Sequence, residues 1–164
     1  MRLVLAAVLA AALSAHGGQQ PAWAESYVGV SGSLVLPPGG SSLRRLGGAT
    51  LFLGANLSDC YSLEAAAGWM ENCAYLSVQT RVHLYAFEVY DRYFGFSPFD
   101  PFFTTGVAGW IGDGFGQVGP KAGIGFLYHL TEDWAVRCDA DATLGLDSRT
   151  EVVYALSVGI QRSF

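Results

Sequence analysis

Large apolar residues alternate with small or polar residues along most of the chain, and this period of two is the pattern of extended strands with two unlike faces. The alternation is clearest over residues 74–87, where a helix would scatter both sets of side chains. It recurs over residues 152–164, where Tyr154, Leu156, Val158 and Ile160 share one face. The pattern therefore predicts strands rather than helices through the body of the chain.

Apolar-rich segments of about ten residues are separated by turn residues, which is the weak repeating signature of a membrane β-barrel. We predict eight strands, at residues 26–36, 48–56, 60–70, 74–87, 102–111, 118–130, 134–145 and 152–164. The faces of 102–111 stay open, because most of its residues are small. The predicted fold class is all-β, an eight-stranded antiparallel up-and-down transmembrane β-barrel with both chain ends on the same side.

Strand register can be predicted for two hairpins. Inward positions are even-numbered in both 48–56 and 60–70, so a three-residue loop that pairs Asn56 with Cys60 keeps both faces in place. In the hairpin that begins at residue 118, if Leu130 opposes Trp134 across the turn, then Gly123 opposes Asp141, and the glycine leaves room for the carboxylate.

The first 24 residues have the pattern of a cleaved export signal. Arg2 precedes a short apolar run at residues 3–13, and Ala22-Trp23-Ala24 is a small-x-small cleavage site. The run is too short to cross a bilayer as a helix, which needs about 20 residues. We therefore assign 1–24 to a cleaved signal peptide and 25–164 to the barrel domain, with a retained membrane anchor as the alternative.

The composition departs from that of a soluble domain. Apolar residues make up 51% and charged residues 14%, against about 25% charged in ordinary globular proteins. The 21 glycines and 13% aromatic residues favour strands whose outer faces meet lipid over a large buried core. The net charge of −5 leaves no basic patch for nucleic acid.

The irregular stretch 88–101 is dense in aromatic residues, which suits a belt at the membrane interface. A small hydrophobic plug or a ligand lid is the alternative.

Reactive side chains are sparse. The three cysteines cannot all pair with one another, and we expect free, mostly buried thiols. His83 and His129 are isolated and predicted to face inward with no nucleophile beside them, so we expect no metal, no cofactor and no catalysis. The glycine-rich turn 112–116 lacks the helix and the Lys-Ser/Thr pair of a phosphate loop.

Charged residues gather on the inward faces of four predicted strands, whose outward faces carry none. A soluble barrel would place its charges on the opposite face. The interior of an eight-stranded barrel is just wide enough for side chains to fill, so we predict a structural network of balanced charges. Its members are Glu64, Arg81, Lys121, Arg137, Asp139 and Asp141. A proton or ion path through them is the alternative.

Three segments carry a family resemblance: PFFTTGVAGW at 101–110, GIGFLYHLTEDW at 123–134 and SVGIQRSF at 157–164. In these segments the chain resembles the OmpA-like outer-membrane β-barrel superfamily of Gram-negative bacteria, and the resemblance covers nearly all of 25–164. It implies location in the outer membrane and a final aromatic residue, here Phe164, that the barrel assembly machinery recognises as its signal.

The function that we predict is an integral outer-membrane barrel with a filled lumen and a structural or surface-exposed role without catalysis. Its expected partners are outer-membrane lipid and, through the last strand, the assembly machinery, and we expect a monomer that binds no nucleic acid. The alternatives are a lipid-modifying barrel enzyme and a soluble periplasmic lipocalin-like binding barrel. In the latter, the outward apolar faces would promote aggregation.

Overall fold

The computed structural model describes residues 26–36, 46–58, 60–71, 73–84, 98–112, 115–146 and 151–164. The predicted signal peptide at 1–24 and residues 88–97 of the aromatic stretch lie outside them. The strands are β1 (Ser26–Leu36), β2 (Leu46–Asn56), β3 (Tyr61–Met70), β4 (Cys73–His83), β5 (Phe99–Gly112), β6 (Phe115–His129), β7 (Trp134–Gly145) and β8 (Glu151–Ser163).

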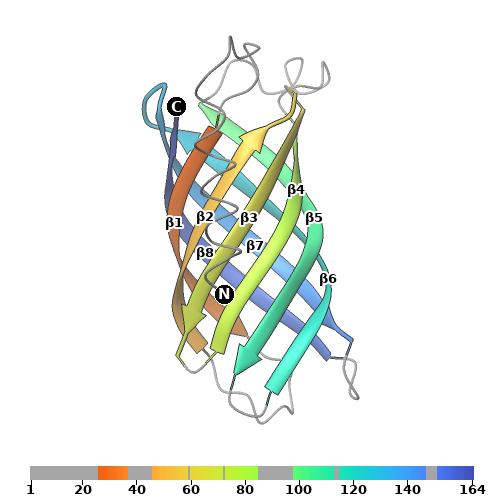
Figure 1. Cartoon of the computed structure of the whole chain (residues 1–164). Coiled ribbons are helices and arrows are strands. Elements are labelled where there is room, and N and C mark those ends of the chain that lie inside the picture. Colours follow the sequence, from red (N-terminus) through yellow and green to blue (C-terminus); the bar gives the residue numbers. More distant parts are fainter. Residues whose placement is uncertain are drawn as a thin grey trace, which may run out of the picture.

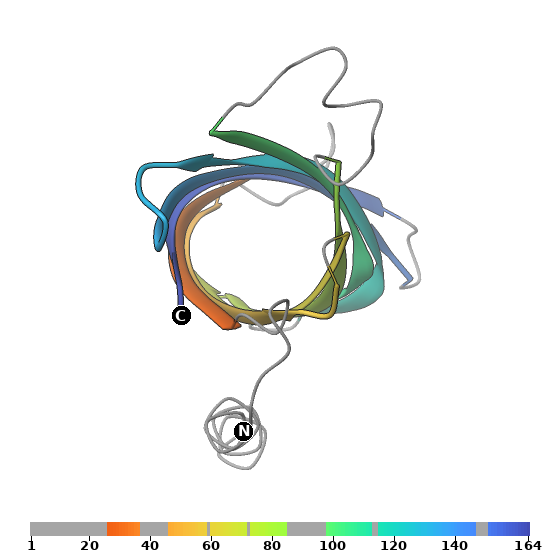
Figure 2. The same cartoon turned by 90° about the horizontal axis from the view of Figure 1, so that it is seen from above.

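These eight strands, counted over the described residues, form one closed barrel in which each strand is antiparallel to its neighbours in chain order (Figure 1 and Figure 2). The predicted all-β, eight-stranded, antiparallel up-and-down barrel is therefore confirmed. In the described part of the chain there is no helix that is long and apolar enough to cross a membrane.

The barrel closes where β1 pairs with β8. The pairing runs from Tyr27 opposite Ser163 to Leu36 opposite Tyr154. Beyond it, Ser26 and Phe164 exchange two backbone hydrogen bonds, with N–O distances of 3.2 and 2.9 Å. We call the end of the barrel that holds Ser26 and Phe164 the terminal rim, and the other end the opposite rim.

The strands are two-faced, as the alternation predicted. Large apolar side chains point outward and stay exposed, for example Val78 at 56% and Val158 at 61%. The structure also orients β5, which the sequence left open: Phe102 and Thr104 are buried in the lumen, whereas Phe103 is half exposed on the outside.

The two predicted registers had different outcomes. Gly123 lies opposite Asp141, as expected. The pairing of Asn56 with Cys60 is wrong, because Asn56 lies opposite Ser62. The loop is two residues longer than predicted, and its backbone amides at 57 and 58 both donate to the Tyr61 carbonyl. A shift of two residues leaves every side chain on its original face.

The connection between β4 and β5 also differs from the prediction. β4 ends at His83, and residues 85–87, predicted to continue it, lie outside the described residues. β5 begins at Phe99, within the stretch predicted to be irregular, and it includes Pro101. The Pro101 carbonyl accepts a hydrogen bond from Leu84 N at 2.9 Å. Because the nitrogen and the carbonyl of one strand residue point to the same side, the Pro101 nitrogen, which has no proton to donate, also points toward the end of β4. A proline is tolerated in a strand where the ladder ends in this way.

Apolar side chains fill the lumen near the opposite rim. The buried cluster consists of Val35, Met70, Tyr75, Ala108, Trp110 and Val153. The Tyr75 and Trp110 rings lie with their centroids 4.5 Å apart. Most of the buried charged side chains therefore lie between this apolar cluster and the terminal rim.

Candidate functional site

Glu64 on β3 is the centre of the larger of two groups of charged side chains in the lumen. Its side chain is 1% exposed, and Oε2 lies 2.5 Å from both Arg81 Nη2 on β4 and Arg137 Nη1 on β7. Gln79 Nε2 donates to Oε1 at 2.7 Å, and the Tyr27 hydroxyl donates to Oε2 at 3.2 Å. The carboxylate therefore joins four strands through hydrogen bonds.

The two guanidinium groups have further partners. Arg137 Nε donates to Asp139 Oδ2 at 2.7 Å, and its Cζ lies 4.4 Å from the centroid of the Phe52 ring. Arg81 lies over the Phe102 ring at 4.5 Å. We call Glu64, Arg81, Arg137 and Asp139 the glutamate cluster. It holds two cations and two anions, so the charges are balanced away from water.

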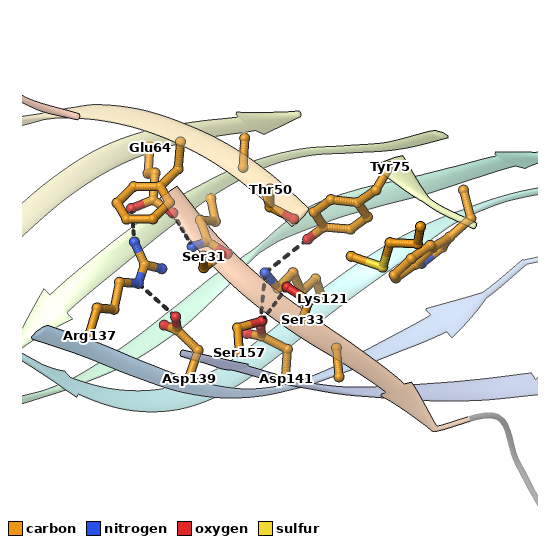
Figure 3. A pocket seen from close by; sticks show the side chains of 16 residues that line it. Ser31, Ser33, Thr50, Glu64, Tyr75, Lys121, Arg137, Asp139, Asp141 and Ser157 are labelled. Carbon is orange, nitrogen blue, oxygen red and sulfur yellow. Dashed lines mark hydrogen bonds and ion pairs between the residues drawn. The ribbon is translucent and has the colours of Figure 1, made fainter. Parts of the chain in front are cut away.

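A second group, which lies nearer the opposite rim, is called the lysine cluster and consists of Lys121, Asp141, Tyr75 and Thr104. Figure 3 labels the first three. Lys121 Nζ on β6 lies 3.1 Å from Asp141 Oδ2 on β7 and donates to the Tyr75 hydroxyl at 3.1 Å. Thr104 Oγ1 donates to Asp141 Oδ1 at 3.2 Å. A Cβ atom at Gly123 would lie 2.2 Å from the same oxygen, so the glycine provides the space that the carboxylate occupies.

All six charged residues predicted from the sequence lie in the lumen. The structure brings four of them into the glutamate cluster and pairs Lys121 with Asp141 in the other. Phe164, the predicted assembly signal, lies apart from both at the terminal rim and is 57% exposed.

A third hydrogen-bonded group, which the sequence did not predict, lies near the terminal rim. His83 Nε2 lies 2.7 Å from Ser62 Oγ, and His83 Nδ1 lies 2.7 Å from Asp100 Oδ2. Ser62 Oγ also donates to Asn56 Oδ1 at 2.8 Å. The prediction that neither histidine has a nucleophile beside it is therefore wrong for His83, whereas His129 is exposed at the rim.

This group could not be predicted because Asp100 does not look like part of a strand. Asp100 lies between two prolines in a stretch that carries turn residues, and strand alternation there becomes visible only when Phe99, Pro101 and Phe103 are placed on the same face. The Ser–His–Asp order is that of a hydrolytic triad. However, Ser62 is 0% exposed, so its hydroxyl is closed to solvent.

The cysteines are free, as predicted, but only Cys73 is buried, whereas Cys60 and Cys138 are partly exposed. Among the described residues there is no group of three or more His, Cys, Asp or Glu side chains that could hold a metal ion.

No protein-family model matches the sequence, and comparison with curated proteins gives no match. Solved structures do match. The outer membrane protein OprG from Pseudomonas aeruginosa has a TM-score of 0.65 at 11% identity, over 86% of this chain and 96% of that one. The N-terminal β-barrel domain of OprF from Pseudomonas aeruginosa has a TM-score of 0.58 at 16% identity, over 84% and 97%. Ail, the attachment invasion locus protein of Yersinia pestis, has a TM-score of 0.54 at 12% identity, over 86% and 99%. At these identities the likeness concerns the fold, and the described residues have the fold of the transmembrane β-barrels.

Proposed function

We propose that the chain is an integral outer-membrane barrel of a Gram-negative bacterium, with a filled, charge-balanced lumen and a structural or surface-exposed role without catalysis. The inverted distribution of side chains carries this proposal. Large apolar residues such as Val118 and Ile124, each 58% exposed, surround the barrel, while the charged side chains of the glutamate and lysine clusters lie in the lumen and are at most 10% exposed. In water such an outer surface would cause aggregation, whereas in lipid it is the stable arrangement.

The terminal rim has a feature of the membrane–water interface. Arg162 Cζ lies 5.6 Å from the centroid of the Trp134 ring, and both side chains are exposed on the outside of the barrel. Tryptophan is enriched at the level of the lipid headgroups, and a long cationic side chain there can reach them. We assign this rim to the periplasmic side, where Phe164 would be recognised during assembly.

Two measurements test the membrane assignment. Membranes washed with carbonate should retain the protein, and an unheated sample should migrate differently on a gel from a heated one. Recovery in the soluble periplasmic fraction would instead support the lipocalin-like binding barrel and contradict the proposal.

One observation favours a second function, ester hydrolysis by a lipid-modifying barrel. It is the hydrogen-bonded series of Ser62, His83 and Asp100. The two 2.7 Å contacts place a hydroxyl, an imidazole and a carboxylate in the order of a nucleophile, its base and the group that orients the base. Two observations weigh against it. Ser62 is fully buried, whereas a substrate carbonyl needs direct access to the hydroxyl, and the single hydroxyl proton is donated to Asn56 Oδ1 rather than to His83.

A serine-directed fluorophosphonate probe separates the two functions. We expect no labelling of the folded protein in vesicles. Labelling that disappears in a Ser62→Ala variant, together with altered lipid A on overexpression, would establish the hydrolase instead.

A further inference from the structure

The two charged clusters face each other across a gap. Figure 3 shows Glu64, Arg137 and Asp139 on one side and Tyr75, Lys121 and Asp141 on the other, and no dashed line connects the two sides. Both clusters line the same cavity, which has a volume of about 30 Å³. Because one water molecule needs about 10–15 Å³ of cavity volume measured in this way, the cavity has room for about two water molecules.

Three buried oxygen atoms of residues that line this cavity have no hydrogen-bond partner within the described part of the chain. They are Thr50 Oγ1, Gln79 Oε1 and Asp139 Oδ1. These residues are 6%, 2% and 9% exposed, so bulk water does not reach them. Buried polar atoms in native proteins almost always have a partner, either from the protein or from an ordered water molecule.

We propose that this cavity is an internal hydration site, and that about two ordered water molecules in it connect the glutamate cluster with the lysine cluster. The water molecules donate hydrogen bonds to the three unpartnered oxygens. Lys121 Nζ carries three protons, of which the Tyr75 hydroxyl and Asp141 Oδ2 accept two. The third is available to a water molecule that fills the gap.

Water fits the cavity better than a metal cation does. The charges that line or adjoin it already balance, because each cluster holds equal numbers of cations and anions. An added cation would lie close to the Arg137 guanidinium and the Lys121 ammonium, both of which would repel it. A dry cavity is also disfavoured, because empty cavities in proteins have apolar linings.

A high-resolution crystal structure of the detergent-folded barrel tests the proposal. We expect electron-density peaks within hydrogen-bond distance of Thr50 Oγ1, Gln79 Oε1 and Asp139 Oδ1, unchanged when sodium in the crystals is exchanged for rubidium. An empty cavity would overturn the proposal. An anomalous rubidium peak at the same position would overturn it in favour of a cation site.

Two substitutions of one residue provide a matched pair. Thr50→Val removes the hydroxyl with little change of shape, and we expect it to lose the peak beside residue 50. Thr50→Ser keeps the hydroxyl and should keep that peak, even if it packs less well. Peaks that are identical in the two variants would contradict the role of Thr50 in holding the water.

Discussion

Removing the Arg137 guanidinium tests whether the lumen charges stabilise one another. The group is buried between Glu64 and Asp139, and Arg137→Met keeps much of the side-chain length while deleting both ion pairs. Glu64 retains Arg81, so the uncompensated charge falls mainly on Asp139. Removing one partner of a buried ion pair lowers the unfolding free energy by about 3–5 kcal/mol. We expect the lower end of that range, because one of the two anions keeps a cation.

A second substitution separates lost pairing from lost packing. In the double variant Arg137→Met with Asp139→Asn, the charges of the glutamate cluster are balanced again, with one cation and one anion. Because no charge is then left unpaired, we expect at least half of the lost stability to return. If packing around the guanidinium were the cause, the second substitution would restore nothing.

The assay is reversible urea unfolding in phosphatidylcholine vesicles, followed by tryptophan fluorescence and by the band shift between unheated and heated samples. Arg162→Met is the matched control, because this guanidinium is exposed and its described contact is the Trp134 ring. We expect it to cost about 0.5–1 kcal/mol at most. A loss in Arg137→Met no larger than in this control would refute the reasoning.

Three further predictions follow from the outer face, the lumen and the last residue. Val78→Arg, at the middle of an outward face, should lower the unfolding free energy in vesicles by about 2–4 kcal/mol, whereas Leu57→Arg at the terminal rim should cost about 0–1 kcal/mol. Equal effects would contradict a lipid-facing surface. Gly123→Ala places a Cβ 2.2 Å from a lumen carboxylate oxygen and should cost about 1–3 kcal/mol in the same assay. Gly116→Ala, with nothing within 4 Å, is its control on the same strand and should change stability by about 0.5 kcal/mol or less. Phe164→Ala should reduce the heat-modifiable protein in cell membranes severalfold, whereas Phe164→Tyr should not; equal amounts would remove its role as an assembly signal.

The faces of the strands could be predicted from the sequence because one simple geometric rule determines them. Successive side chains in a strand point to opposite sides, so the apolar outside and the charged inside follow once the strands are identified. The pairing of Gly123 with Asp141 was also predictable. It follows from a turn that places Leu130 opposite Trp134, and the glycine leaves the space that the carboxylate needs.

The contacts of His83 were not predictable in the same way. Its partner Asp100 lies beyond a long connection, and the prolines on both sides of Asp100 indicate a turn when they are considered alone. The structure places Asp100 on β5 next to the end of β4 because the pairing of the two strands extends to Phe102 opposite His83. Long-range pairing thus overrides the local preference for a turn.

The pairing of Asn56, which was predicted wrongly, indicates that the lumen charges help to select the register of the strands. A slip of two residues keeps every apolar side chain outside and every polar one inside, so the alternation alone cannot choose between Cys60 and Ser62 as the partner. Ion pairs distinguish such registers, because they require particular atoms to meet. A slip of two residues between neighbouring strands moves a side chain by about 7 Å along the barrel, which would separate Glu64 from Arg81. The glutamate and lysine clusters together involve five consecutive strands, from β3 to β7. We therefore infer that the buried charges specify the register of the barrel, while the apolar outer face provides most of the driving force for insertion.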